Sequence, residues 1–371
     1  MTANVPRLTS LVLGGGGLKG FAHIGVLRAL EERGITPAVY AGTSIGSLIA
    51  AARAGGMSVN EMEQRARALR KRDLFRINHV GMLLERMRSP SLYLPDPLHE
   101  LCSSVVPACT FDDIGAPLLV NTVDVERGIQ LVWGLPGLRN VLVTDAVYAS
   151  CALPGFFPPG QVGNRVCIDG GTIDNLPVGI AALGMDAVIA VDTGSSDLSP
   201  ATDVGRHGFA AIFMRAATTM MHALQQPPLE GWSGPPMLLI RPRVSHLHWF
   251  NFSQTGEIID AGYQAASAAL EQAGDALLGG SGVYPRRSIE VSVDRSLCIG
   301  CGTCVALEPN IMALDAQNKA FAIKPRFDWS PVDGSFVEKC PTMAISASTL
   351  NGSGSRTSAP TRQATVDAAD D

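Results

Sequence analysis

The sequence has no apolar run long enough to cross a bilayer and no cluster of basic residues. A membrane-spanning helix needs about 18 consecutive apolar residues, and no stretch of the chain reaches that length. Lys and Arg total 29 against 34 Asp and Glu, which gives a net charge of −5. The chain therefore lacks the excess of positive charge with which proteins bind nucleic acid. We therefore expect no nucleic-acid partner and a soluble, cytoplasmic protein.

Charged residues are also scarce, at 17% of the chain against 46% hydrophobic residues, which allows a sizeable buried core. A length of 371 residues exceeds one typical domain and suggests one large and one small domain. Of the eight cysteines, four form a metal-like pattern late in the chain and the others are scattered. This usage fits a reducing compartment better than a disulfide framework.

A G-x-S-x-G pattern centred on Ser44 stands between a predicted strand and a predicted helix that ends at Gly55-Gly56. In such a turn the serine is exposed at the carboxyl end of the strand. Gly42 and Gly46 then have no Cβ to collide with the neighbouring chain. This pattern is typical of a nucleophile, but a helix N-cap serine between two packing glycines would look the same.

A glycine-rich loop follows a strand predicted over residues 9–13 and precedes a helix predicted to Arg33. Residues 15–20 also satisfy G-x-G-x-x-G, but the ribose-binding acid of a dinucleotide fold is missing where the second strand ends in Tyr40-Ala-Gly42. The loop is instead predicted to form an oxyanion hole from its backbone N–H groups. The candidate donors are Gly15, Gly16, Gly17 and Leu18. Tight-turn packing is the simpler alternative.

Strands and helices alternate along the chain, which predicts a parallel sheet with its site at the carboxyl ends of the strands. Asp169 ends a predicted strand and precedes Gly170-Gly171, so it is a candidate partner for Ser44 at the same sheet edge. An Asp-Gly turn residue is the alternative.

We further predict a mobile or lid-like insertion over 75–97, and a helix over 147–159 that ends in an apolar, proline-rich wall.

Cys298, Cys301 and Cys304 are spaced to wrap three corners of an iron–sulfur cube, and Cys340-Pro341 supplies a remote fourth thiolate. Zinc sites more often show two C-x-x-C pairs. The pattern therefore favours one iron–sulfur cluster.

Three motifs in this order resemble those of patatin-like phospholipases: Gly15–Gly20, Gly42–Gly46 and Asp169–Gly171. The resemblance covers roughly residues 8–280 and extends to His23, to 152–158 and to 174–177. Lys19 stands where the family has arginine or lysine. The family implies a three-layer α/β fold and a Ser44–Asp169 dyad that hydrolyses lipid acyl esters without a cofactor. The supporting motif residues are Lys19, Gly20, Gly42, Gly46, Gly170 and Gly171.

An α/β-hydrolase triad is a rival interpretation, because four histidines follow Asp169 in the required order: His207, His222, His246 and His248. Only two strands precede Ser44, however, and the glycine loop follows the first of them. This placement favours the dyad over the triad.

The segment 288–347 resembles single-cluster bacterial ferredoxins, which have a small α+β fold and a [4Fe–4S] or [3Fe–4S] centre. Four cysteines favour [4Fe–4S], and Glu308 stands where a two-cluster ferredoxin would have a further ligand. We expect four segments: an acyl hydrolase domain over 8–280, a linker over 281–287, the cluster domain over 288–347 and a disordered tail over 348–371.

The expected function is lipid acyl hydrolysis of the phospholipase or lysophospholipase type, with an electron-transfer or redox-regulatory role for the cluster. Expected partners are a fatty-acyl ester, a transient membrane surface, which would be the inner membrane, and a redox partner protein. Two other interpretations are an electron-transfer protein whose first domain binds lipid or a partner with little turnover, and a lipid-responsive regulatory module.

Overall fold

A computed structural model of the chain describes residues 5–77, 91–194, 208–244 and 252–350. The chain divides into two compact units, Met1–Pro285 and Arg286–Asp371. In the described part of the chain, no helix combines the length and the apolar character that crossing a membrane requires.

The first unit is built on a sheet that has nine strands within the described residues, in the order β5-β6-β3-β2-β1-β7-β8-β9, with β4 also paired to β3. The strands are β1 (Thr9–Leu13), β2 (Val39–Thr43), β3 (Leu118–Asp124), β4 (Ile129–Trp133), β5 (Gly160–Val162), β6 (Arg165–Asp169), β7 (Ala187–Val191), β8 (Met237–Ile240) and β9 (Val283–Tyr284). Neighbours from β3 to β9 are parallel. Strands β4 and β6 pair antiparallel with β3, and β5 pairs antiparallel with β6.

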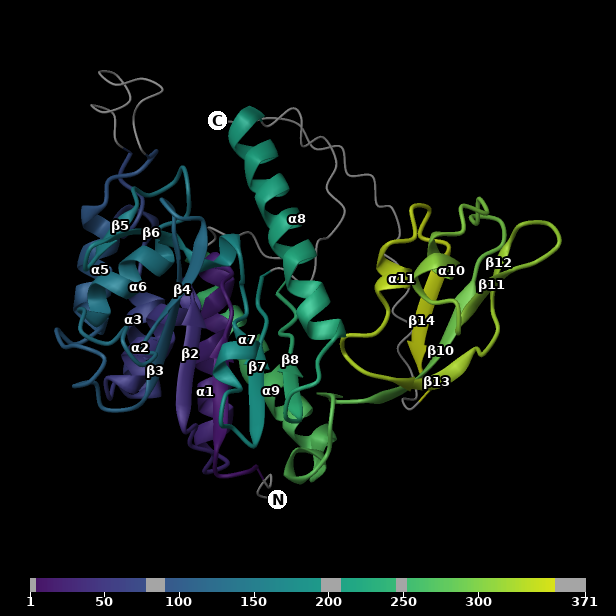
Figure 1. Ribbon diagram of the computed structural model, residues 1–371, viewed down its shortest axis with the longest axis horizontal. Coiled ribbons are helices and arrows are strands. Elements are labelled where there is room, and N and C mark those ends of the chain that lie inside the picture. The colour runs from purple at the N-terminus through teal and green to yellow at the C-terminus, as the bar shows by residue number, and fades with distance from the viewer. Residues whose placement is uncertain (1–4, 78–90, 195–207, 245–251, 351–371) are drawn as a thin grey trace. The chain divides into compact units, whose positions relative to one another are not determined.

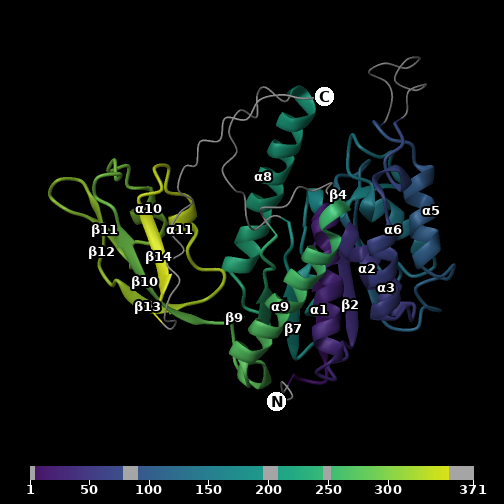
Figure 2. The same cartoon turned by 180° about the vertical axis from the view of Figure 1, so that it is seen from behind.

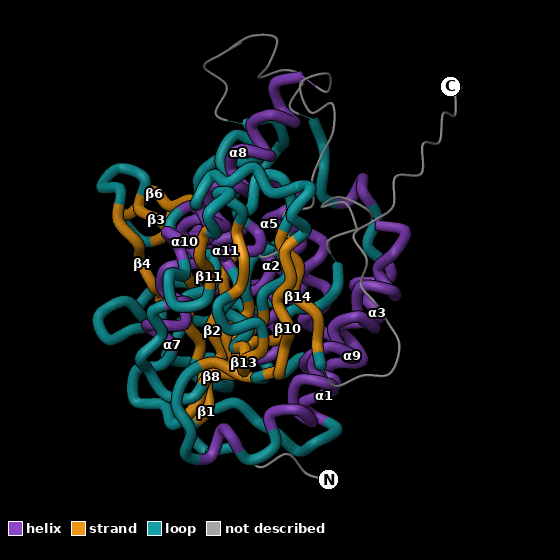
Figure 3. Tube along the Cα trace, turned by 90° about the vertical axis from the view of Figure 1, so that its right-hand side faces the viewer, coloured by secondary structure: helices purple, strands orange, loops and turns teal. Residues whose placement is uncertain are grey.

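Helices cover both faces of this sheet. They are α1 (Ala22–Glu31), α2 (Ile45–Ala54), α3 (Val59–Ala68), α5 (Asp96–Val105), α6 (Val143–Cys151), α7 (Val178–Ala181), α8 (Gly208–Glu230) and α9 (Thr255–Ala273). Figure 1 shows α7 in front of the strands, and Figures 2 and 3 show α1, α3 and α9 along the opposite face. The predicted three-layer α/β fold with a mainly parallel sheet is confirmed.

The strands in the middle of the sheet are mainly apolar and shielded from solvent. Strands β1, β7 and β8 are buried along their whole length, as expected for parallel strands covered on both faces. Helix α1 lies tightly against α9 because two glycines face the partner helix. A Cβ on Gly25 would come within 1.8 Å of the Ile259 carbonyl oxygen, and one on Gly262 within 1.9 Å of that of Ala22.

One helix differs from the prediction in its boundaries. The helix predicted over 147–159 is α6, which begins at Val143 and ends at Cys151, because Pro154 disfavours helical backbone in the residue before it. Helix α9 ends at Ala273, because Gly274 after it takes a φ of +51°.

The predicted linker over 281–287 also differs from the structure. Val283 and Tyr284 form β9, the edge strand of the first sheet, and β10 already begins at Arg287. Apolar Val283 is only 2% exposed, so burial against the sheet explains why this segment is a strand.

The second unit has a sheet of β10 (Arg287–Val293), β13 (Arg326–Trp329) and β14 (Ile345–Thr349) in the order β13-β10-β14, with antiparallel neighbours. A hairpin of β11 (Met312–Leu314) and β12 (Ala320–Ala322) and two short helices, α10 (Thr303–Leu307) and α11 (Ser335–Glu338), complete it. The predicted small α+β fold is confirmed.

The second unit has its own core, in which Phe336 is 1% exposed and packs with Ile289, Val291 and Met312. Ser348 and Thr349, which fall in the predicted disordered tail, belong instead to β14 and pair with β10. Residues 351–371 of the predicted tail lie outside the described residues.

Candidate functional site

Ser44 occupies a strained turn between β2 and α2. Its φ of 54° and ψ of −130° are rare for a residue with a side chain and cost about 1–3 kcal/mol. Both flanking glycines are required by contacts. A Cβ on Gly42 would lie 2.5 Å from the Gly46 backbone, and one on Gly46 would lie 2.1 Å from the Leu13 carbonyl oxygen. Ser44 stands at the N-cap of α2, yet its side chain makes no capping hydrogen bond.

The backbone of Ser44 is held by residues that the sequence did not single out. Its N–H donates to Ser150 Oγ at 2.9 Å, and the Ser150 hydroxyl donates to the Asn121 carbonyl at 2.7 Å. The Ser44 carbonyl accepts from the Ser47 hydroxyl at 2.7 Å. No short motif marks Ser150 or Asn121, because α6 and β3 meet the turn only through tertiary packing.

Asp169 is 2% exposed and lines the same pocket as Ser44. Its Oδ1 accepts the Gly171 N–H at 2.8 Å. Burial raises the pKa of Asp169 from 3.8 to about 6, although the Gly171 N–H and the Ser44 hydroxyl act to lower it as hydrogen-bond donors. The carboxylate is therefore ionised at neutral pH and accepts a proton near pH 6.

The route by which Asp169 reaches Ser44 differs from the one predicted. Strand β6 is antiparallel to β3, so strand direction alone would place its carboxyl end at the opposite edge from the ends of the parallel strands. The register brings the two residues together instead. Asp169 pairs with Thr122 on β3, while Thr43, just before Ser44, pairs with the adjacent Asn121.

Both glycines after Asp169 are also required by close neighbours. A Cβ on Gly170 would lie 2.5 Å from the side-chain nitrogen of Asn121, and one on Gly171 would lie 2.8 Å from Asn175 Oδ1. Asn175 belongs to the 174–177 stretch that the sequence analysis noted.

The glycine loop lies beside Ser44 with one correction to its predicted donors. The Gly15 N–H donates to the Asn175 carbonyl at 3.3 Å, so it is not available to a substrate. In the described part of the chain, the N–H groups of Gly16, Gly17 and Leu18 have no acceptor, because they precede or begin the 3-10 turn Gly17–Phe21. These three N–H groups match an oxyanion hole.

Two further residues of this loop are packed inside the domain. Lys19 is only 5% exposed. A Cβ on Gly20 would lie 2.1 Å from the Ile45 side chain, just after Ser44, so this glycine allows the loop to contact the start of α2.

Of the histidines in the rival triad, His207, His246 and His248 lie outside the described residues. His222 is on α8, with its Nε2 3.4 Å from the Gln226 side chain.

An apolar pocket of about 720 Å³, including the part open to solvent, contains both Ser44 and Asp169. Phe157, in the apolar wall predicted at the end of the 147–159 segment, lines it, whereas Phe156 packs against the Tyr93 ring at 6.0 Å between centroids. Of the insertion predicted over 75–97, residues 78–90 lie outside the described part and Phe75 lines the pocket. Leu18, Ile45 and Leu153, which belong to stretches already noted in the sequence, also line the pocket. The sequence did not single out the remaining apolar lining residues: Leu48, Leu74, Leu98, Leu101 and Met221.

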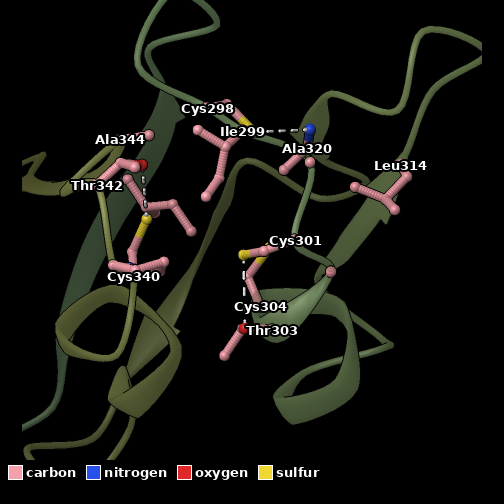
Figure 4. A pocket seen from close by; sticks show the side chains of 14 residues that line it. Cys298, Ile299, Cys301, Thr303, Cys304, Leu314, Ala320, Cys340, Thr342 and Ala344 are labelled. Carbon is pink, nitrogen blue, oxygen red and sulfur yellow. Dashed lines mark hydrogen bonds between the residues drawn. The ribbon is translucent and has the colours of Figure 1, made fainter.

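The four predicted cluster ligands, Cys298, Cys301, Cys304 and Cys340, line a single pocket of the second unit, and Figure 4 shows their side chains around it. In the ranges that the structure describes, no three His, Cys, Asp or Glu side chains are arranged to hold a single metal ion.

The polar groups near these sulfurs suit thiolates. The Ala320 N–H donates to Cys298 Sγ at 3.4 Å. The hydroxyl and N–H of Thr303 lower the pKa of Cys301. Burial raises the pKa of Cys340, but hydrogen bonds from Thr342, Ala344 and Ile345 outweigh it and leave that pKa lowered. A set of four soft sulfur donors with N–H and O–H support fits an iron–sulfur cluster.

Comparisons with known proteins agree with this division. A family model described as patatin-like phospholipase matches residues 11–182, and one described as 4Fe-4S single cluster domain matches residues 291–347. An uncharacterized NTE family protein of Mycobacterium tuberculosis is 31% identical over 199 residues, which cover 53% of this chain and 52% of that protein. The chain thus spans about half the length of that relative.

Two longer relatives align over a similar number of residues. Patatin-like phospholipase domain-containing protein 6 of Homo sapiens is 34% identical over 202 residues, or 54% of this chain and 14% of that protein. Lysophospholipase NTE1 of Mycosarcoma maydis is 35% identical over 192 residues, which cover 50% of this chain and 10% of that protein.

Among solved structures, VipD from Legionella pneumophila covers 72% of this chain and 67% of its own, with 16% identity and a TM-score of 0.38. That likeness is too slight to bear on the fold or the site. The two family matches, each over the unit that holds the corresponding motif residues, establish the organisation. The chain has a patatin-like phospholipase domain followed by a 4Fe-4S single-cluster domain.

Proposed function

We propose that the first domain is a serine-dependent carboxylic ester hydrolase that acts on lipid acyl esters, with Ser44 as nucleophile and Asp169 as base. The Ser44 hydroxyl and the buried Asp169 carboxylate line one apolar pocket, and the hydroxyl acts on the pKa of the carboxyl group as a hydrogen-bond donor would; this arrangement carries the proposal. The lysophospholipase among the relatives supports phospholipid or lysophospholipid substrates.

In the acylation step, Asp169 takes the proton of Ser44 while Oγ attacks the ester carbonyl carbon. The N–H groups of Gly16, Gly17 and Leu18 stabilise the oxyanion that develops on the carbonyl oxygen. The alcohol part of the ester leaves with the proton that Asp169 held. Water, deprotonated by the same Asp169, then attacks the acyl-serine and releases the fatty acid.

The apolar walls of the pocket support a fatty-acyl chain as the group beside Ser44. Leu98 and Leu101 of α5, Met221 of α8 and Phe157 all line it. Each methylene of a chain buried there contributes about 0.8 kcal/mol. Long-chain esters should therefore have lower KM values than acetyl esters until the chain outgrows the pocket.

We also propose transient contact with a lipid surface through α8, which accounts for the expected membrane partner. Phe213, Met220 and Leu224 recur at helical spacing and are 36%, 58% and 51% exposed. Met221 of the same helix lines the pocket. Such an apolar helix face binds a bilayer interface weakly and reversibly.

The test is hydrolysis of p-nitrophenyl esters from acetyl to palmitoyl by the full chain and by Ser44→Ala and Asp169→Asn, with and without phosphatidylcholine vesicles. Both variants should lose about 10²- to 10⁴-fold in kcat, whereas Ser103→Ala on α5 should match wild type. Wild-type rates should rise with chain length and with vesicles. Equal turnover by Ser44→Ala and an active wild type would refute the dyad. A wild type without measurable turnover would favour a lipid-binding or regulatory domain.

For the second domain we propose one [4Fe–4S] cluster held by its four cysteines. Such a cluster accepts and donates single electrons when bound. Ester hydrolysis moves no electrons, so the cluster has no part in the chemistry at Ser44. We propose that ester hydrolysis does not depend on the cluster, which would then serve a redox partner protein. Esterase rates measured with the cluster oxidised, reduced and removed test this proposal, because a rate that follows the redox state would favour regulation of the first domain instead.

A further inference from the structure

The peptide groups at the start of the glycine loop are held by side chains from three other parts of the first domain. The Gly14 carbonyl accepts a hydrogen bond from His23 Nε2 at 2.8 Å. The Gly15 carbonyl accepts from Asn175 Nδ2 at 3.2 Å and from the Thr193 hydroxyl at 3.5 Å. Asn175 also takes the Gly15 N–H with its own carbonyl. Asn175 therefore forms hydrogen bonds with both the N–H and the carbonyl of Gly15.

His23 completes this arrangement as a neutral donor. It is fully buried, and burial lowers its pKa to about 4. Because a carbonyl oxygen can only accept, the proton of the neutral ring is on Nε2. With the Gly14 carbonyl held by His23, the Gly15 N–H is directed toward Asn175.

Peptide geometry links these bonds to the candidate oxyanion hole. The Gly15 carbonyl and the Gly16 N–H belong to one planar trans peptide group, so they point in opposite directions. When the Asn175 side chain fixes the carbonyl, it also fixes the direction of the Gly16 N–H. That N–H is the first of the three without an acceptor in the described residues, and Gly16 lines the pocket with Ser44.

The Asn175 side chain is itself held in place from α8. Its second amide hydrogen points to Gln225 Oε1 at 3.5 Å, and Gln225 Nε2 donates to Asp192 Oδ2 at 2.8 Å. Asp192 lies 3.5 Å from the Arg241 guanidinium. Asn175, Gln225 and Asp192 are 2%, 4% and 1% exposed. Hydrogen bonds in such a dry setting restrict the rotamers that Asn175 can adopt.

We propose that Asn175 is a positioning residue for the oxyanion hole, which sets the direction of the Gly16 N–H through its hydrogen bond to the Gly15 carbonyl. The inference rests on the proposed ester hydrolysis at Ser44. Gln225 supports Asn175 from α8. The position requires an amide, because a carboxylate has no hydrogen to donate to the Gly15 carbonyl.

The test compares Asn175→Ala with wild type in kcat and KM for p-nitrophenyl butyrate and in Ki for an alkyl trifluoromethyl ketone. The ketone adds to the serine and places an oxyanion where the ester's would form. A misdirected donor should lower kcat by about 10- to 100-fold and raise Ki by the same factor. KM should stay within about twofold, because the ground-state ester does not use the hole.

Gln130→Ala is the matched control. Its amide contacts Asn121 at 2.9 Å and Asp174 at 3.2 Å, so its loss loosens the same loop without touching Gly15. It should leave kcat and Ki near wild type. An equal effect of Gln130→Ala would overturn the proposal in favour of general loosening. So would a lower kcat in Asn175→Ala with an unchanged Ki.

Asn175→Asp adds a second readout. A Cβ on Gly171 would lie 2.8 Å from Asn175 Oδ1 and 3.2 Å from Asp169 Oδ1, so the two side chains are close neighbours. A new carboxylate there should lower kcat as Asn175→Ala does and move the pH–rate profile to higher pH. An active Asn175→Asp with an unshifted profile would contradict the proposal.

Gln225→Ala covers the case in which Asn175 variants do not fold. Loss of one hydrogen bond to Asn175 should lower kcat roughly threefold to tenfold and raise Ki equally. No change in either constant would overturn the inference. A wild-type chain without esterase activity would instead refute the proposed function itself, so the two failures are distinct.

Discussion

The raised pKa of Asp169 makes both the activity and the stability of the first domain depend on pH in a calculable way. Folding moves this pKa from 3.8 to about 6 because the carboxyl group is buried. At about 1.36 kcal/mol per pKa unit, the change corresponds to about 3 kcal/mol. Because the folded pKa is raised, the folded chain holds the proton more tightly than the unfolded chain. The group's contribution to stability is therefore present below about pH 4 and lost as the pH rises through about 6.

Asp169→Asn removes this titration while keeping the shape of the side chain. Urea unfolding of both proteins between pH 4 and pH 8 should show the variant gaining about 3 kcal/mol relative to wild type as the pH rises. Groups that the two proteins share cancel in the difference. A difference that stays constant, or that favours wild type at high pH, would refute the argument that burial dominates at Asp169.

The rate of ester hydrolysis should depend on the same carboxyl group, but it should rise with pH where the stability falls. A base must be ionised, so wild-type kcat/KM should rise about tenfold per pH unit below 6 and level off above it. A profile that is flat from pH 4 to pH 8 would show that Asp169 is not the base.

Three further predictions concern the turn, the domain boundary and the cluster. Gly46→Ala should abolish activity and lower the temperature of thermal unfolding, since its Cβ would overlap a backbone oxygen. Gly179→Ala is the control and should unfold at nearly the wild-type temperature, because its Cβ would have no atom within 4 Å. A chain ending at Pro285 should keep esterase activity, and one ending at Leu278 should lose stability with strand β9. Cys301→Ser should lose the visible absorbance of the cluster and keep the esterase rate.

Local patterns carried much of the sequence-based prediction. The serine turn could be predicted because the strand, the G-x-S-x-G turn and the helix follow one another in the sequence, although the contact that requires Gly46 comes from Leu13 of β1. The alternation of strands and helices likewise indicated a covered parallel sheet, which the structure has.

Contacts between distant segments could not be predicted in the same way. The antiparallel direction of β6 places Asp169 beside Ser44 through register, and no residue pattern encodes that direction. The use of the Gly15 N–H by Asn175 depends on a loop about 160 residues away, and the hydrogen bond from Ser44 to Ser150 has the same origin. Leu98 and Leu101 have helical spacing that marks a buried face, but not which pocket it lines.

Labelling by an alkyl fluorophosphonate tests the central claim, that Ser44 is a nucleophile activated by Asp169, most directly. The full chain is incubated with the reagent, and the modified residue is mapped by tandem mass spectrometry. We predict a single adduct on Ser44, formed much more slowly in Asp169→Asn. The absence of an adduct on Ser44, or equal labelling of the Asp169→Asn variant, would contradict the account.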